Sequence, residues 1–111
     1  MEWAEEGIKV KAIEDIDEKY AKFAGRYYVL SDGRVWSTHK KGFLTNSITS
    51  KGYVFVKFWA DNTIQNRRLN ILIAEAFVEK PEGWTPKWDA AHLDDNPLNN
   101  DYKNIQWQTR K

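Results

Sequence analysis

Hydrophobic and polar positions follow two different periods along the chain, and these periods predict its main elements. Residues 52–60 alternate with a period of two and carry large side chains on both faces, which is typical of a buried strand. From Leu69 to Phe77 the apolar residues recur every three or four positions, which predicts a helix with one buried face. The middle of the chain is therefore expected to pack a strand and a helix against each other.

Shorter segments complete the predicted fold. Residues 27–29 and 34–38 are strand candidates joined by a turn with glycine, and they predict a β-hairpin. Near the end of the chain, extended segments around 87–92 and 105–108 flank a loop rich in Asn and Asp. The pattern predicts a small single α+β domain with an antiparallel sheet and a core helix.

The N-terminal segment has a different character. Residues 4–24 are rich in Glu, Lys and Ala, apolar residues from Ile8 to Tyr20 recur at helical spacing, and Gly25 is a stop signal. We therefore expect an acidic helical segment over 1–25, followed by the main domain over 26–111. The acidic helix could cover the sheet or dock a host protein, and both interpretations are open.

Composition and charge narrow the class of protein. The chain has 111 residues, 41% hydrophobic and without cysteine, which indicates one domain with a packed core and no disulfides. Its apolar runs are far shorter than the roughly 20 residues that span a bilayer, and its acidic start is unlike a signal peptide, so a cytoplasmic location is expected. Residues 25–80 hold nine basic and four acidic groups, whereas acidic groups predominate on either side. A basic middle fits contact with nucleic acid, although on charge alone a mixed solvated surface is the simpler interpretation.

Candidate chemistry is concentrated between His92 and Asn104. A histidine on one extended segment and an amide on the returning segment are a suitable pair for general base catalysis. The amide carbonyl would accept a hydrogen bond from one ring nitrogen and leave the other nitrogen free to take a proton from water. The intervening asparagines can brace the loop through hydrogen bonds to its backbone.

This tail resembles the "NHIDGNxLNN…NLxW" signature of phage and intron-type HNH endonucleases, whose metal finger has a ββα shape. The resemblance assigns the general base to His92 and the orienting amide to Asn104. Two upstream segments match as well: residues 28–37 resemble the "YxVSNxGRVxS" module, and residues 52–77 resemble "GYxxV…LVAxAF". The three segments occur in family order over residues 26–109, and the resemblance implies an HNH fold that acts on DNA.

The metal site implied by the resemblance is incomplete in this sequence. The family uses a divalent cation such as Mg²⁺, held by a residue just before the general base and by a second on a helix after the last strand. Ala91 occupies the first position, and the second is expected beyond Lys111, so the ββα finger is incomplete. Asp94 and Asp89 are substitute candidates. Either the chain is a fragment of a longer nuclease, or it is a complete protein that has lost catalysis and kept binding.

We expect DNA contacts from basic residues on or between the predicted strands, from the start of the core helix, and from one amide where relatives carry a histidine. These candidates are Arg34, Lys40, Lys41, Arg67, Arg68 and Asn70. For the arginine pair, phosphate binding and a solvated helix start are both open. Lys51 and Lys57 lie in the same region, where a surface lysine without function is the simpler interpretation.

Two functions follow as hypotheses. The first is an HNH endonuclease-like DNA-binding protein in which His92 activates water for phosphodiester hydrolysis, with a divalent metal as cofactor. The second is a catalytically inactive HNH-fold phage factor that needs no cofactor and binds DNA or a host nucleic-acid-processing protein as a regulator or inhibitor. A phage-encoded protein would work in the host cytoplasm. Whether the chain is an enzyme is therefore open at this point.

Overall fold

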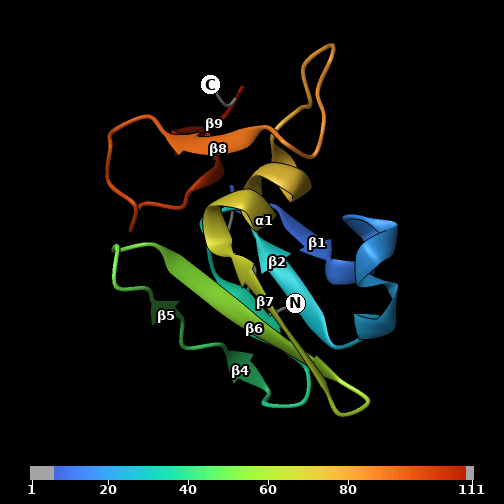
Figure 1. Ribbon diagram of the computed structural model, residues 1–111. Helices are drawn as coiled ribbons and strands as arrows, with labels where there is room; N and C mark the ends of the chain where they lie inside the picture. The colour runs from blue at the N-terminus through green and yellow to red at the C-terminus, as the bar shows by residue number, and fades with distance from the viewer. Residues whose placement is uncertain (1–6, 110–111) are drawn as a thin grey trace.

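The computed structural model describes residues 7–109. Short strands and 3-10 helices surround a single α-helix within that part of the chain (Figure 1). In chain order the elements are β1 (Val10–Ala12), η1 (Ile13–Asp15), η2 (Glu18–Phe23), β2 (Tyr27–Leu30), β3 (Val35–Ser37), β4 (Gly42–Phe43), β5 (Ser47–Ile48), β6 (Val54–Ala60), β7 (Thr63–Arg68), α1 (Leu69–Phe77), β8 (Asp89–His92), η3 (Tyr102–Asn104) and β9 (Ile105–Gln108).

The strands form three antiparallel sheets in the orders β1-β2-β3-β4, β5-β6-β7 and β8-β9. β2 and β3 make the hairpin predicted from the sequence, and β8 pairs with β9 as the two-stranded part of the predicted finger. The small α+β architecture predicted from the pattern is confirmed.

The strand β7 was not predicted, because its sequence is mostly polar on both faces. It forms through its pairing with β6, which places Thr63 opposite Ala60. Asp61 and Asn62 between them have φ angles of 50° and 62°, the left-handed pair that a two-residue hairpin turn requires. A strong strand and a favourable turn are therefore enough to order a polar partner strand.

The helix α1 has the predicted bounds and lies between the β8–β9 hairpin and the β6–β7 hairpin (Figure 1). Leu72 and Ile73 on its buried side are fully enclosed. They belong to a core that also includes Phe58 of β6 and Trp107 of β9. Burial of these side chains removes apolar surface from water and joins the terminal hairpin to the rest of the fold.

The single helix predicted over 4–24 is wrong in the part of the chain that the structure describes. Residues 4–6 lie outside that part, and after them Val10–Ala12 form a strand on β2, followed by two 3-10 helices. The helically spaced Tyr20, together with Phe23, is buried in the common core. The division of the chain at residue 25 stays a prediction.

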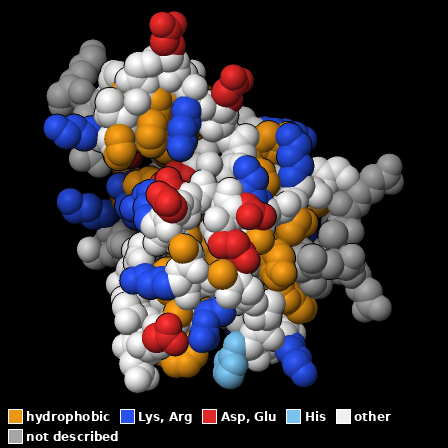
Figure 2. Space-filling view, turned by 90° about the vertical axis from the view of Figure 1, so that its right-hand side faces the viewer, with side chains coloured by type: hydrophobic (Ala, Val, Ile, Leu, Met, Phe, Trp, Pro, Cys, Tyr) orange, Lys and Arg blue, Asp and Glu red, His pale blue; other side chains and the backbone are white. Residues whose placement is uncertain are grey.

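The face with the N-terminal 3-10 helices is shown in Figure 2. On this face Lys and Arg side chains are interspersed with Asp, Glu and hydrophobic side chains. Among the described residues of this face, acidic side chains do not predominate as the expected acidic docking helix would require. Within residues 7–109, no helix has the length and apolar character needed to cross a membrane.

Candidate functional site

The β8–β9 hairpin places His92 at the end of β8. His92 pairs with Ile105, and Ala90 pairs with Trp107, so these residues share the face of the hairpin that packs on α1. Asn70 of α1 donates a hydrogen bond of 2.7 Å from Nδ2 to the backbone oxygen of Ala90. The strand that carries His92 is therefore held by its partner strand and by the helix.

Asn70 was predicted to contact DNA, and the structure contradicts this. Its side chain is 3% exposed, and its amide is engaged by the carbonyl of Ala90. Because an unpaired carbonyl at this position would be buried, Asn70 stabilises the attachment of β8 to α1.

The loop after His92 closes around the carboxylate of Asp94. Its oxygens accept hydrogen bonds from the side chains of Asn99 and Asn104, each at 2.9 Å, and from the backbone of Asn96 at 2.8 Å. These bonds favour the ionised form, those from Asn99 most strongly, and they lower the pKa of Asp94 to about 2. Asp94 therefore braces the loop as a permanent anion near neutral pH.

Asn104 completes this loop and does not orient His92 as predicted. Its Oδ1 accepts a hydrogen bond from the backbone of Asp94 at 3.1 Å, and its Nδ2 also donates to the backbone oxygen of Asn99 at 2.9 Å. Both ends of the Asn104 amide are therefore engaged within the loop, and its hydrogen bonds among the described residues do not include His92.

Asn100 takes the orienting role instead. Its Oδ1 lies 2.7 Å from Nε2 of His92, and its Nδ2 donates to the backbone oxygen of Pro97 at 3.1 Å. Since the amide nitrogen is directed to Pro97, the oxygen must face the imidazole, and Nε2 of the neutral ring must carry the proton. Nδ1 of His92 is then the nitrogen with a free lone pair, able to accept a proton.

The turn of the β2–β3 hairpin supports Asn100 from behind. Gly33 has a φ of +99°, and a Cβ added there would lie 3.1 Å from the backbone oxygen of Asn100. Beside it, the backbone oxygen of Ser31 accepts a hydrogen bond of 2.8 Å from the backbone of Tyr102. The upstream hairpin and the His92 loop therefore form one packed unit.

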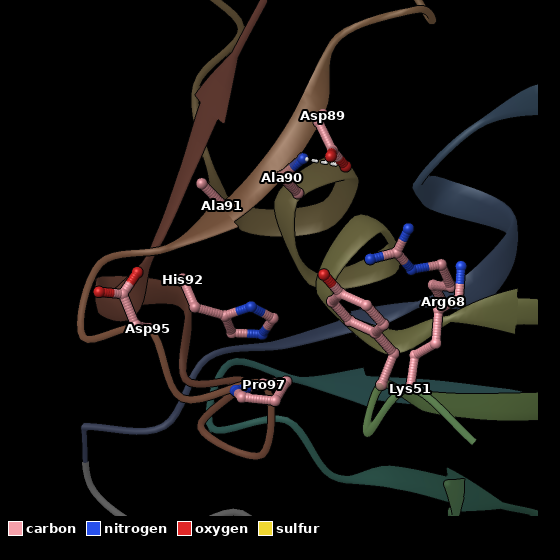
Figure 3. Close-up of a pocket in the computed structure, with 9 residues that line it drawn as sticks. Lys51, Arg68, Asp89, Ala90, Ala91, His92, Asp95 and Pro97 are labelled. Atoms are coloured by element: carbon pink, nitrogen blue, oxygen red, sulfur yellow. Dashed lines mark hydrogen bonds between the residues drawn. The ribbon is translucent and has the colours of Figure 1, made fainter. Parts of the chain in front are cut away.

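His92 opens onto a pocket of about 360 Å³. Three parts of the chain that are far apart in sequence line it: the turn before β6, the end of β7, and β8 with its loop. The lining residues are Lys51, Tyr53, Arg68, Asp89, Ala90, Ala91, His92, Asp95 and Pro97. In Figure 3 the imidazole of His92 points toward the side where Lys51 and Arg68 lie, whereas the side chain of Ala91 and the carboxylate of Asp95 point away from it.

One wall of this pocket is cationic and aromatic. The guanidinium carbon of Arg68 lies 4.0 Å from the centre of the Tyr53 ring, and the exposed Lys51 lies beside them in the same lining. The other wall carries Asp89, one oxygen of which accepts a hydrogen bond of 3.0 Å from the backbone of Ala90. An anionic group that approaches His92 would meet the two cations on the first wall.

The residues present do not fit the divalent metal that the family resemblance implies. Ala91 offers only a methyl group, and both oxygens of Asp94 accept hydrogen bonds from the loop. Asp89 lies in the pocket, but residues 7–109 bring no three His, Asp or Glu side chains together in a group that could hold an ion. The substitute roles predicted for Asp94 and Asp89 are therefore not supported by the donor set.

Of the basic residues predicted to contact DNA, Arg68 lies in this pocket, and the others are elsewhere. Arg67 points to the opposite face of β7 and bonds the carboxylate of Glu75 at 3.0 Å. Arg34 forms an ion pair with Asp32 at 2.7 Å. Lys40 and Lys41 are exposed in the turn between β3 and β4. For Arg34, Lys40, Lys41 and Arg67, DNA contact stays a prediction.

Sequence reasoning missed the parts that Tyr53 and Asn100 play. Tyr53 belongs to the "GYxxV" segment, where it was treated only as a strand residue. Asn99 and Asn100 are consecutive, and the sequence does not indicate which of the two reaches the ring of His92. The features of the sequence that could have indicated these roles are the position of Tyr53 next to Gly52 and the two consecutive amides at Asn99 and Asn100.

Comparisons with known proteins show a similarity in sequence and in fold to HNH endonucleases. No family model matches the chain. It is 29% identical over 85 residues to an uncharacterized HNH endonuclease of Acanthamoeba polyphaga mimivirus, a match that covers 77% of this chain and 25% of the relative. Its fold resembles the HNH homing endonuclease I-HmuI, solved in a study of DNA binding and cleavage, with a TM-score of 0.75 and 25% identity over 91% of this chain and 52% of that one. The chain thus spans about a quarter of the length of the curated relative and about half of the solved chain.

Proposed function

Because the chain resembles HNH endonucleases in sequence and in fold, we propose that it binds DNA and holds a backbone phosphate in the pocket beside His92. The observation that carries this proposal is the placement of Lys51, Arg68 and His92 in one pocket. Lysine and arginine side chains provide most of the affinity of proteins for the DNA backbone.

Exposed basic residues outside the pocket would extend the contact along the duplex. Lys40 and Lys41 are exposed, and the ion pair of Arg34 with Asp32 is only half-buried. We therefore propose that the pocket sets the position of one phosphate and that these surface cations contribute to affinity without sequence specificity.

The binding of DNA can be tested by fluorescence anisotropy with a labelled duplex over a series of salt concentrations. We expect log K to fall linearly as log salt rises, because the protein displaces counterions from phosphates. Arg68→Gln should weaken binding and reduce the slope by about 1. Absence of binding even at low salt would contradict the proposed function.

Hydrolysis of the phosphodiester is a second candidate, favoured by the tautomer of His92. With Nε2 donating to Asn100, Nδ1 can take a proton from a water molecule as that water attacks phosphorus. The bond from phosphorus to the leaving sugar oxygen then breaks, solvent protonates the released oxygen, and Asn100 stabilises the imidazolium that forms. Asn100 is in this scheme the residue that positions the base.

A plasmid-nicking assay separates binding from cleavage. The chain and its His92→Ala variant are compared with and without Mg²⁺ at protein concentrations that saturate the DNA. Nicking by the unaltered chain and none by the variant would establish His92 as a catalytic residue. Equal absence of nicking in both would leave DNA binding as the function.

A further inference from the structure

The pocket beside His92 offers cationic side chains where the family resemblance implies a metal ion. We propose that Arg68 and Lys51 hold the phosphate in this pocket directly, so that the chain binds DNA without a divalent cation. The inference rests on the proposed binding of DNA and adds to it the groups that make the contact. It starts from the misfit of the donor set, in which a methyl group stands at Ala91 and the Asp94 carboxylate is engaged by the loop.

Arg68 is ordered for this role before any ligand arrives. Its guanidinium lies over the ring of Tyr53, with the guanidinium carbon 4.0 Å from the ring centre. A guanidinium in contact with an aromatic face keeps the N–H groups along its edges available for a planar set of oxygen acceptors. Tyr53 therefore positions the guanidinium of Arg68 without taking up its charge.

The donors of Arg68 also lack acceptors within the described part of the chain. Its Nε is buried and has no hydrogen-bond partner among residues 7–109, and no salt bridge to Arg68 is formed there. The Nε of the adjacent Arg67 is also buried without a partner among these residues, but the guanidinium of Arg67 is paired with Glu75 through Nη2. A buried donor without an acceptor costs free energy. Because no carboxylate of the described residues neutralises the guanidinium of Arg68, its charge is available to a bound phosphate.

Lys51 adds a second charge from a turn that contacts the His92 loop. The turn closes with a hydrogen bond of 2.9 Å from the backbone of Gly52 to the backbone oxygen of Thr49. A Cβ added at Gly52 would lie 3.9 Å from Cγ of Pro97, so this turn and the loop approach each other closely. Lys51 is exposed, and its flexible ammonium can follow the phosphate as a point charge.

Among the described residues, neither carboxylate of the pocket forms a salt bridge with these cations. Asp89 bonds the backbone of Ala90 at the start of β8. In Figure 3 the carboxylate of Asp95 points away from His92. The space in front of the imidazole therefore faces Arg68 and Lys51, which suits a singly charged phosphodiester better than it suits a divalent cation.

The test is the anisotropy titration of a labelled duplex at constant ionic strength, once with EDTA and once with Mg²⁺. We expect the same affinity in both buffers. Arg68→Gln and Lys51→Gln should each weaken binding by about tenfold or more, since each removes a charge-assisted hydrogen bond. The affinity of Arg68→Lys should fall between those of the unaltered chain and Arg68→Gln, because lysine keeps the charge and loses the planar contact with Tyr53.

Lys22→Gln is the matched control. Lys22 is an exposed cation on η2 that lies 5.4 Å from the ring centre of Phe23, outside the lining of the pocket. Its substitution removes one positive charge and should leave the affinity nearly unchanged. Thermal unfolding of each variant shows whether the fold is retained.

The outcomes separate this inference from the function on which it rests. Binding that is lost in EDTA and restored by Mg²⁺ would overturn the inference and leave DNA binding in place. Binding that ignores EDTA but is weakened equally by all three glutamine variants would overturn it as well, because only net charge would matter. Absence of binding in every buffer would refute the proposed function itself.

Discussion

Gly33 offers a sharp test of the way in which the fold holds His92. Its φ of +99° is a conformation that L side chains rarely adopt, and an added Cβ would lie 3.1 Å from the backbone oxygen and 3.3 Å from the backbone carbon of Asn100. Gly33→Ala should cost about 1–2 kcal/mol for the backbone conformation. Relief of the close contact should cost about 1–2 kcal/mol more. We therefore expect the free energy of unfolding to fall by about 2–4 kcal/mol.

Urea and thermal unfolding measure this loss, which corresponds to a fall in Tm of roughly 8–16 °C for a domain of this size. Gly83→Ala is the matched control, because Gly83 also has a positive φ, +81°, but nothing lies within 4 Å of an added Cβ. The control should lose only the conformational part, about 1–2 kcal/mol. The difference between the two variants measures the contact with Asn100.

A second measurement tests whether the displacement of Asn100 in Gly33→Ala reaches His92. Because Asn100 binds Nε2 of His92, movement of its backbone should change the NMR signals of the His92 ring in Gly33→Ala and leave them unchanged in Gly83→Ala. Equal losses of stability in the two variants, with unchanged His92 signals in both, would refute the conclusion that the hairpin turn supports the loop.

Three further predictions concern stability. Asn70→Ala should lower the free energy of unfolding in urea by about 1–3 kcal/mol, because the buried oxygen of Ala90 loses its partner; an unchanged midpoint would contradict this. The hydrogen bonds to Asp94 lower its pKa from 3.8 to about 2. Their contribution to the free energy of unfolding is therefore present above about pH 4 and lost as the pH falls toward about 2. Asp94→Asn should remove this pH dependence from thermal melts. Burial, and then the hydrogen bond to Glu75, raise the pKa of Tyr20 far above its usual value near 10, so stability should decline as the pH rises past about 10, and less so in Tyr20→Phe.

Local patterns were sufficient to predict the elements whose side chains repeat with a clear period. The strand β6 alternates buried Val54, Val56 and Phe58, and the helix α1 has the predicted bounds from Leu69 to Phe77. Both have an apolar face whose burial favours one conformation, so the prediction needed no knowledge of neighbouring elements.

The N-terminal segment shows where this reasoning stops. Its apolar residues have helical spacing, but Val10 pairs with Leu30 in a sheet, and the remaining residues bury Tyr20 and Phe23 through 3-10 turns. Hydrogen bonds to a strand that is distant in sequence outweigh a modest local preference for helix. The polar strand β7 could not be predicted for the same reason, because it forms through its hydrogen bonds to β6 and has no apolar pattern of its own.

The site was predicted in its residue types and only partly in its contacts. His92 lies in a pocket with the predicted Arg68, yet the amide that reaches the imidazole belongs to Asn100 and not to Asn104. The loop is rich in asparagines, and which one reaches the ring depends on a backbone path that includes a positive φ at Asp95. Spacing along the sequence cannot decide between them.

The most direct test of the central claim is an NMR titration of the imidazole rings with a short DNA duplex in EDTA. His92 and His39 are the two histidines of the chain, and His39 lies outside the pocket, so one reports on the site and the other on general changes in solution. A phosphate held beside His92 should shift the ring signals of His92 in proportion to the fraction bound, and Arg68→Gln should reduce that shift. Saturation of the protein with DNA while the His92 signals stay in place would contradict the account.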